Sequence, residues 1–532
     1  MRARLSRLLL RLAVHCDALA SHPATYAKAT WWRLCGKRLR ARLTLAPLLG
    51  RSRWAYRLWL VSQPKADLSI SSNIDRNEIL ALVAEGDGAE ATLASLATEG
   101  LASKLVTRPS TYEAKWVLPL RAGDVLALGA GAAYAEAVAQ ADQATRLIYA
   151  DDDLLTTGGL HRNPHFKPDW NRELFAHCDY LSGTALMRVT PEDFANLDGP
   201  DWIAKLTKRL ARDCQDNDNA IVHLHQILHH RRTRPEADFP APLAARLSDA
   251  ASLPSVSVIV PTRNRLDLLR TCLDGLARTT YPQKLDIIVI DNGSDDPPTL
   301  EYLANLNPGF AKVLRDDGPF NFAALNNRAV EQASGEMLCF LNNDIEVGDP
   351  GWLMPMVQQA SRGDVGAVGA RLLYPDGRIQ HAGVVLGIGG GAAHAHRLLD
   401  PAEAGYFHRH SLPQFTSAVT AACMVVAREK FLAIGGFDAE HFAVSFNDVD
   451  LCMRLAEHGW KSLYDPRATL VHHESVSRGF DRDAAGSARL ASELAELQKR
   501  WGTRRGSTGD DTVDRYHHPA LSRFSEHFVV DV

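Results

Sequence analysis

From Ser255 onward, short apolar runs alternate with helical stretches, and this alternation limits the possible folds more than any other feature of the sequence. Three runs have the length and composition of strands buried on both faces: residues 256–260, 287–290 and 337–341. Helical periodicity separates them, around residues 266–276 and 323–333. The alternation predicts an α/β fold with a doubly wound, mostly parallel sheet.

Polar residues follow each of the three predicted strands. They are Pro261, Thr262, Arg263 and Asn264 after the first strand, Asp291 and Asn292 after the second, and Asn342, Asn343 and Asp344 after the third. The carboxyl ends of parallel strands meet at one edge of a sheet, which is where ligands of such folds bind. Three polar strand ends in register therefore predict a ligand site at this edge.

The phosphates of a nucleotide ligand need positive charge, and two common ways of supplying it are absent from the sequence. There is no GxxxxGK[ST] loop, and no GxGxxG follows the first strand. A carboxylate that holds Mg²⁺ or Mn²⁺ is the remaining common solution. Asp344, directly after a buried strand, suits that role, although its spacing fits a turn or helix-cap aspartate equally well.

Two further polar clusters lie downstream. Asp448 and Asp450 open a predicted helix, where acids are favoured by the helix dipole and where a carboxylate could also act as a general base. His472 and His473 follow the apolar run 468–471 and could ligate a metal ion or contact phosphate. A lone histidine there would usually be structural, but a pair after a strand favours a functional interpretation.

Taken in order along the chain, these clusters resemble glycosyltransferase family 2, whose nucleotide-binding domain has the GT-A fold. The matching stretches lie within residues 255–480 and are residues 257–264, 290–294, 340–344, 435–438 and 447–452. Residues 379–384 and 472–479 are most similar to the bacterial rhamnosyltransferase-like branch. The resemblance implies an inverting enzyme that moves a sugar, with rhamnose as one candidate, from a nucleotide sugar to a glycan or lipid-linked acceptor in O-antigen or other surface polysaccharide biosynthesis.

The resemblance also implies a role for each site residue. Asp344 matches the last acid of the family's DxD motif, where Asn342 replaces the first acid. Asp448 matches the general base of the ED motif, and His472 or His473 matches the histidine that completes the site, so Asp344 and these histidines are the implied ligands of Mg²⁺ or Mn²⁺. The implied nucleotide-sugar contacts are Pro261, Thr262, Arg263, Asn264, Asp291, Asn292, Asn326, Asn342 and Asn343.

The preceding part of the chain resembles the first domain of tandem members of the same branch. Residues 147–153 and 166–170 carry this resemblance, but no initial strand with a Pro-Thr turn is recognisable. At the place expected for a first DxD motif, residues 126–132 contain no acid. We therefore expect a degenerate, non-catalytic GT-A-like domain. The expected organisation is a basic helical segment (1–65), the degenerate domain (66–235), a linker (236–254), the catalytic domain (255–485) and a helical tail (486–532).

Composition restricts the partners and the compartment. The net charge of −4 gives no reason to expect nucleic acid as a partner. Eight cysteines without a CxxC pair favour free thiols in a reducing compartment, and no apolar run has the length of a membrane span, so we expect a cytoplasmic protein.

Residues 1–60 form a basic block, with 13 Lys and Arg against one acid. On a helix, Leu5, Leu8, Leu9, Leu12 and Cys16 would share one face. Such a helix could lie on the anionic inner face of the cell membrane, or it could pack on its own protein.

Two classes of function remain for the chain as a whole. The first is the glycosyltransferase described above. The second is a non-catalytic carbohydrate- or nucleotide-binding protein built on a decayed transferase fold. Retention of both Asp344 and Asp448 favours the first, because a decayed site would be expected to lose such acids.

Overall fold

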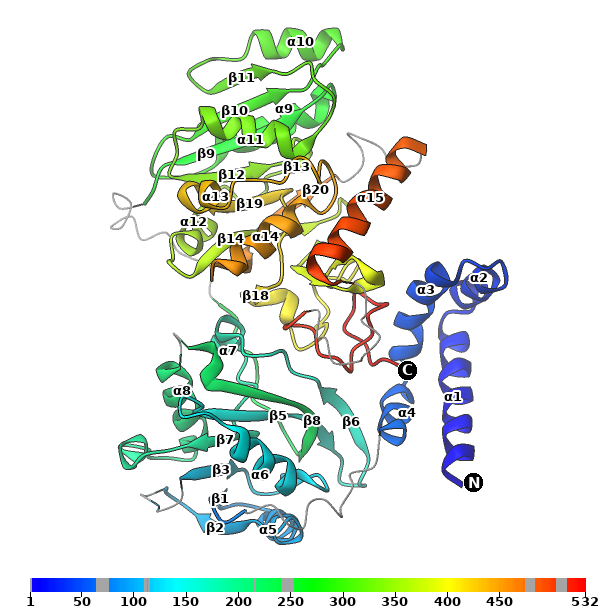
Figure 1. Cartoon of the computed structure of the whole chain (residues 1–532), viewed down its shortest axis with the longest axis vertical. Helices are drawn as coiled ribbons and strands as arrows, with labels where there is room; N and C mark the ends of the chain where they lie inside the picture. Colours follow the sequence, from blue (N-terminus) through cyan, green and yellow to red (C-terminus); the bar gives the residue numbers. More distant parts are fainter. Residues whose placement is uncertain are drawn as a thin grey trace. The chain divides into compact units, whose positions relative to one another are not determined.

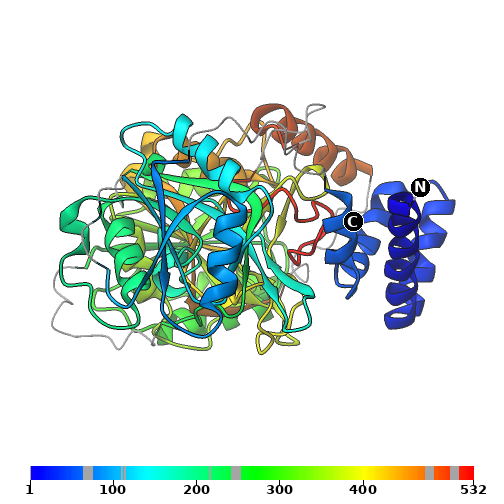
Figure 2. The same ribbon diagram turned by 90° about the horizontal axis from the view of Figure 1, so that it is seen from below.

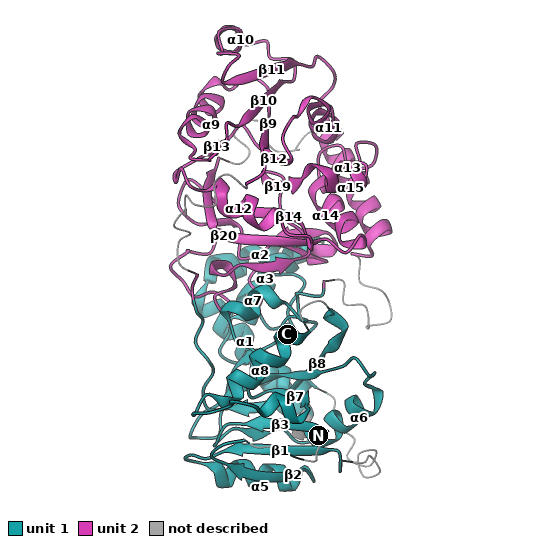
Figure 3. Ribbon diagram, turned by 90° about the vertical axis from the view of Figure 1, so that its left-hand side faces the viewer, with its two compact units in different colours: residues 1–238, 515–525, 529–532 teal, residues 239–514, 526–528 magenta. Residues whose placement is uncertain are grey.

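The computed structural model forms two compact units, which are coloured separately in Figure 3. Unit 1 comprises residues 1–238, 515–525 and 529–532, and unit 2 comprises residues 239–514 and 526–528. The structure describes residues 2–63, 76–109, 112, 115–214, 217–240, 253–473, 484–503 and 514–532. Most of the expected linker and the stretch 474–479 of the resemblance lie outside these ranges.

The sheet of unit 2 begins with four neighbouring parallel strands (Figure 1), in the order β11 (Ala311–Arg315), β10 (Asp286–Asp291), β9 (Val256–Thr262) and β12 (Met337–Leu341). The sequence predicted the last three of these strands. It also predicted the helices α9 (Leu266–Arg278) and α11 (Phe322–Gln332), but not α10 (Pro297–Ala304). The fully buried Ile259, Leu338 and Phe340 explain the uninterrupted apolar runs, since these strands have no solvent-exposed face.

Beyond β12 the sheet becomes mixed. The antiparallel β19 (Cys423–Ala427) lies between β12 and β14 (Val365–Leu373), and β14 pairs in parallel with β20 (Lys461–His472). The remaining elements are β13 (Ile345–Glu346), β15 (Ile379–His381), β16 (Val384–Leu386), β17 (Ala392–His394), β18 (Gln414–Thr416), α12 (Leu353–Ala360), α13 (Arg428–Ala433), α14 (Asn447–Glu457) and α15 (Ala484–Trp501). The expectation of a mostly parallel doubly wound sheet is confirmed, with the antiparallel β19 inserted and the short strands β13, β15 and β18 paired antiparallel to β20 or β14.

Unit 1 contains a second sheet, in the order β2, β1, β3, β7, β5, β8 and β4, with β6 beside β5. The strands are β1 (Ile79–Ala84), β2 (Ala102–Val106), β3 (Trp116–Leu120), β4 (Val125–Leu126), β5 (Leu147–Leu155), β6 (His161–His165), β7 (Ala185–Arg188) and β8 (Ile221–Arg231). The helices of this part are α5 (Ala89–Thr98), α6 (Ala130–Gln140), α7 (Arg172–His177) and α8 (Trp202–Asp213).

The two sheets share one strand order and one set of strand directions, except that the described strands of unit 1 include no counterpart of β11 or β18. In both sheets an antiparallel strand, β7 or β19, separates the parallel strands from a long parallel pair, β5–β8 or β14–β20. The register of that pair shifts at the same point, directly after Ala150 in unit 1 and after Ala370 in unit 2. Unit 1 is therefore a GT-A-like domain, as expected, and β1 supplies the initial strand that was not recognisable in the sequence.

The shared order corrects where the first DxD motif was placed. The loop that corresponds to residues 342–344 follows β3 and comprises residues 121–124, whereas residues 126–132 run from the end of β4 into α6. The register supports this assignment, because Val125 pairs with His230 as Ile345 pairs with His472. Asp124 therefore corresponds to Asp344, and the loop retains one acid.

The basic N-terminal block forms four helices of unit 1 that pack on one another, drawn in blue in Figures 1 and 2. They are α1 (Arg2–Ser21), α2 (Pro23–Leu34), α3 (Arg38–Gly50) and α4 (Ala55–Ser62). Leu10 and Val14 of α1 are buried with Leu58, and the opposite face of α1 is exposed. None of the described helices is both long enough and apolar enough to cross a membrane.

The structure also tests two smaller predictions, the free cysteines and the helical C-terminal tail. All eight cysteines are free thiols, as expected; Cys16 and Cys35 are exposed, Cys178 is half-buried and the other five are buried. Among the described residues of the expected helical tail, α15 is helical, and residues 514–532 form turns and one isolated bridge between Leu521 and Val530.

Candidate functional site

The strand-end residues of unit 2 form one hydrogen-bonded group at the carboxyl edge of the sheet. The backbone N–H of Asn292 donates to the Thr262 carbonyl (2.8 Å), and the side chain of Asn343 donates to the Thr262 hydroxyl (2.9 Å). Asn292 also donates to the carbonyls of Asp316 and Gly318. The ends of β9, β10 and β12 are thus joined as the sequence predicted.

The other expected nucleotide contacts differ in how they are placed. Asp291 is buried beside Arg315, and its carboxylate accepts a hydrogen bond from the backbone amide of Ser294. Asn264 forms hydrogen bonds with residues 294–296. Pro261 is half-buried and Arg263 is exposed next to them. Asn326 does not join this group, because its fully buried side chain donates to Phe322 within α11.

Asp344 and His472 form the centre of the site. His472 Nε2 lies 3.0 Å from Asp344 Oδ1, and both side chains are buried. The other ring nitrogen, Nδ1, lies 2.7 Å from Gln380 Oε1, which can only accept. Gln380 therefore fixes the proton on Nδ1 and turns the lone pair of Nε2 toward Asp344.

This donor set fits a divalent cation. A carboxylate oxygen and an imidazole nitrogen lie side by side, and the side-chain amide of Asn342 lies 3.4 Å from the same Nε2. The N and O of an amide interchange by a half-turn, so Asn342 can present its oxygen there. His473 faces elsewhere, since its Nε2 lies 2.9 Å from Glu346 while only its backbone N–H meets the Asp344 carbonyl. Of the two histidines, His472 is the one beside Asp344.

Asp448 lies in the first turn of α14, next to this group. Its carboxylate accepts from the backbone amides of Ala421 (3.1 Å) and Val449 (2.9 Å). The neighbouring Ala422 accepts from the Asn342 amide (3.0 Å), so residues 421–422 connect Asp448 to the end of β12. Burial raises the pKa of Asp448 above its ordinary value, although the two amides oppose the shift. A raised pKa makes this carboxylate a stronger proton acceptor.

The neighbouring acid of the same motif has a structural environment. Asp450 is fully buried and pairs with Arg454 and Arg500, and it also accepts from the Trp501 indole. Asn447 donates to the Val444 carbonyl. Of the two acids that open α14, only Asp448 lacks an arginine partner among the described contacts, and it therefore remains the candidate base.

In unit 1 an arginine lies beside the corresponding acid. The guanidinium of Arg231 lies 3.6 Å from Asp124 and 3.9 Å from Asp152, and all three side chains are buried. By register Arg231 corresponds to His473. Lys167, also fully buried, lies 3.0 Å from Asp152. Built-in cations therefore neutralise Asp124 of this loop and Asp152 of β5, which leaves less need for a metal ion.

Comparison with known families agrees with this geometry. Residues 257–392 match the model of the family described as Glycosyl transferase family 2. Unit 2 carries a family 2 glycosyltransferase domain. The matched range contains β9, β10 and β12 and the loop with Asp344, and it ends before His472 and Asp448.

Proteins similar to this chain include an uncharacterized protein and two proteins whose names refer to O-antigen biosynthesis or sugar transfer. The chain is 36% identical over 430 residues to the uncharacterized protein y4gI of Sinorhizobium fredii, which covers 72% of this chain and 46% of that protein. It is 36% identical over 380 residues to the O-antigen biosynthesis protein RfbC of Myxococcus xanthus, which covers 63% and 29%. An N-acetylglucosaminyl-diphospho-decaprenol L-rhamnosyltransferase of Mycobacterium tuberculosis is 28% identical over 220 residues, or 37% of this chain and 69% of that protein.

The match is partial in length for the first two relatives, because the chain spans less than half of either. A solved mannosyltransferase, PcManGT from Pyrobaculum calidifontis in complex with GDP-Man and Mn²⁺, aligns with 46% of this chain and 65% of its own. The sequence identity is 21% and the TM-score is 0.35.

Proposed function

We propose that the family 2 domain of unit 2 transfers a sugar from a nucleoside diphosphate sugar to a hydroxyl of a glycan or lipid-linked acceptor, in surface polysaccharide biosynthesis. The observation that carries this proposal is the juxtaposition of Asp344 and His472 at the strand ends with Asp448 beside them. A rhamnosyltransferase and an O-antigen biosynthesis protein among the relatives support this class of product, with rhamnose as one candidate sugar.

Different residues of the site would bind the metal ion and the nucleotide. Asp344, His472 and the amide of Asn342 would hold Mg²⁺ or Mn²⁺, which neutralises the diphosphate when it is bound. Thr262, Asn292 and Asn343 shape the edge against which the nucleotide lies.

Asp448 accepts the proton of the acceptor hydroxyl. That oxygen forms a bond to the anomeric carbon as the bond to the diphosphate breaks, and the nucleoside diphosphate leaves with the bonding electrons. A single displacement of this kind inverts the anomeric configuration.

The test is a transfer assay with a panel of sugar nucleotides, Mn²⁺ or Mg²⁺, and lipid-linked and oligosaccharide acceptors. Asp448→Asn should reduce transfer by about 10²–10⁴-fold, the range of general base catalysis, and leave nucleotide binding nearly unchanged. Wild-type transfer by this variant would remove Asp448 from the reaction. If nucleotide binding were retained and no donor were turned over, a non-catalytic binding protein would be favoured instead.

We also propose that α1 binds the anionic inner face of the cell membrane. Its outward stripe of Leu5, Leu8, Leu9 and Leu12 is more than half exposed at each position. The same block is strongly basic, and apolar stripes flanked by Lys and Arg bind anionic bilayers. The large exposed area of these four leucines favours the membrane over the alternative left open by the sequence.

Co-sedimentation with vesicles containing anionic lipid tests this surface. Replacing Leu8 and Leu12 by Gln should lower binding, and the same change at Leu128 and Leu160, which are equally exposed elsewhere in unit 1, should not. Equal binding by both double variants, or equal binding to vesicles without anionic lipid, would count against the proposal.

A further inference from the structure

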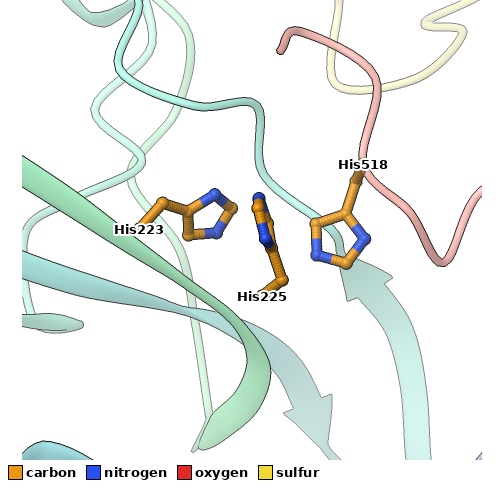
Figure 4. Close-up of side chains that lie close together, drawn as sticks. All are labelled: His223, His225 and His518. Atoms are coloured by element: carbon orange, nitrogen blue, oxygen red, sulfur yellow. The ribbon is translucent and has the colours of Figure 1, made fainter. Parts of the chain in front are cut away.

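Three histidines of unit 1 lie close together, although they come from distant parts of the sequence. His223 and His225 belong to β8, and His518 lies in the segment 515–525 that completes unit 1. Figure 4 shows the three imidazoles beside one another, with His225 between the other two. Their ligand nitrogens all lie within 4.8 Å of one another.

Two carboxylates adjoin these rings. Asp169 Oδ1 lies 3.1 Å from His223 Nδ1 and 2.9 Å from His225 Nε2. Asp151, which is fully buried, lies 3.1 Å from His223 Nε2 and 2.7 Å from His518 Nε2. Two carboxylates therefore face three imidazoles, and the contacts that His223 and His225 make with these carboxylates are hydrogen bonds.

The contact between His518 and Asp151 is close but not aligned as a hydrogen bond. His518 Nε2 and Asp151 Oδ2 lie 2.7 Å apart, yet neither atom has a hydrogen-bond partner of acceptable geometry. Both side chains are buried, and an unsatisfied buried polar atom costs about 1–3 kcal/mol. Two ligands of one ion show such an off-axis contact, because the ion rather than the neighbouring ligand occupies the lone-pair axis.

We propose that His223, His225 and His518 bind one divalent transition-metal ion of the zinc class, with Asp151 as a fourth ligand and Asp169 orienting the rings. Imidazole nitrogens favour zinc over the oxygen-seeking Mg²⁺ and Mn²⁺. Zn–N bonds of about 2.0–2.1 Å require the ring nitrogens, which lie within 4.8 Å of one another, to close around the ion. The side chain of His225 is 33% exposed, so an ion can enter from that side.

The proton positions show what binding must change. The backbone N–H of Ala520 donates to His518 Nδ1 (2.9 Å), so the metal-free ring carries its proton on Nε2. An ion bound at Nε2 displaces that proton, and a ring that stays a neutral ligand carries its proton on Nδ1, where it faces the Ala520 N–H and opens that contact. Metal binding and the conformation of residues 518–520 are therefore coupled.

A second cluster in unit 1, Asp153 with His161 and His230, contrasts with the first. Asp153 Oδ2 accepts from the Tyr56 hydroxyl (2.6 Å) and lies 2.9 Å from His161, while Oδ1 lies 2.7 Å from His230. Each carboxylate oxygen already has an aligned donor. This cluster is a satisfied hydrogen-bond network, and its histidines provide matched controls.

The experiment uses the full chain, made without a histidine tag, loaded with Zn²⁺ and dialysed before elemental analysis. Wild type should retain on the order of one zinc per chain, and His518→Ala and the double change His223→Ala with His225→Ala should lose it by at least about tenfold. His161→Ala should retain it. Asp344→Ala should also retain it, which separates this site from the ion proposed for unit 2.

Two outcomes would overturn the proposal. One is a zinc-loaded wild type that retains no metal, and the other is His518→Ala that retains as much as wild type. Because the double variant could misfold, Co²⁺ substitution of wild type supplies an independent readout: visible d–d bands should appear and be displaced by Zn²⁺. Hydrogen exchange at residues 514–525 should increase when a chelator removes the ion, and unchanged exchange would contradict the coupling.

Discussion

The two sheets of this chain have the same strand order but treat the acid after the third parallel strand in opposite ways. In unit 2, Asp344 faces a histidine whose bare nitrogen is aimed at it by Gln380. In unit 1, Asp124 faces the buried guanidinium of Arg231. A site that accepts an external cation needs ligand atoms with free lone pairs and no fixed positive charge beside them, whereas an arginine supplies a permanent charge at the place of the metal.

The difference also shows how unit 1, which we expect to be non-catalytic, neutralises the acids that it retains. The charges of Asp124 and Asp152 are retained in unit 1 and are balanced from within by Arg231 and Lys167. Unpaired buried carboxylates would destabilise the fold, so an internal cation is a stable alternative to a bound one.

The largest effect should come from removing the acid in each sheet in turn. Asp344→Ala should lower sugar transfer by about 10³-fold, equivalent to about 4 kcal/mol, because the diphosphate loses its cation. Asp124→Asn should leave transfer unchanged. Initial rates with saturating donor measure both, and a comparable loss in the two variants would show that unit 1 shares in the chemistry.

The next effect concerns stability. Arg231→Met leaves Asp124 without its buried cation, whereas Asp152 keeps Lys167 and Arg234, and it should destabilise unit 1 by about 3–5 kcal/mol. Unfolding followed by hydrogen exchange separates the units, and peptides of β3 and β8 should lose protection while those of β9 and β12 keep theirs. If Arg231→Met instead gained Mn²⁺ binding without destabilisation, the arginine would be only a steric block.

A smaller effect is expected from the residue that orients His472. Gln380→Leu should weaken Mn²⁺ binding by about 10–100-fold, because the ring loses the acceptor that fixes its tautomer. Titration of the Mn²⁺ electron spin resonance signal measures this affinity. Gln332→Leu, at the exposed end of α11, is the matched control, and equal affinities in the two variants would dissociate Gln380 from the metal.

The smallest effect concerns the pH dependence of transfer and appears only at low pH. Since burial raises the pKa of Asp448, the base becomes protonated at a higher pH than an ordinary aspartate, and kcat/KM should fall as the pH drops through that raised pKa. Protonation of Asp448 should not affect kcat/KM at neutral pH. A pH–rate profile checks this, and an acid limb at or below the ordinary value of 3.8 would contradict the assignment.

The sequence predicted the elements whose apolar pattern is continuous and missed those whose pattern is weak. Strands β9, β10 and β12 and helices α9 and α11 were predicted because they are long or fully buried. Strand β11 was missed because most of it is exposed at the sheet edge. The antiparallel direction of β19 could not be predicted from the sequence either, because a buried strand has the same composition in either direction.

The sequence predicted individual site residues but not the contacts that distinguish between them. Asp344 and Asp448 stand where the resemblance placed them, but the choice between His472 and His473 depended on Gln380, which lies far away in the sequence. The acid-free loop assigned to unit 1 was wrong, because the boundaries of β3 and β4 moved the loop to residues 121–124. The His223–His225–His518 cluster was not foreseen, since no local spacing links its members.

The return of residues 515–525 and 529–532 to unit 1 affects how the chain can be synthesised and divided. Leu521 and Val530 bridge to each other there, and Val529 packs against Gly50 so closely that a methyl group on Gly50 would overlap it. A ribosome must therefore finish unit 2 before unit 1 has all of its parts, although N-terminal domains generally fold first. A gene cut between the two halves would leave the first protein without the segment that completes it.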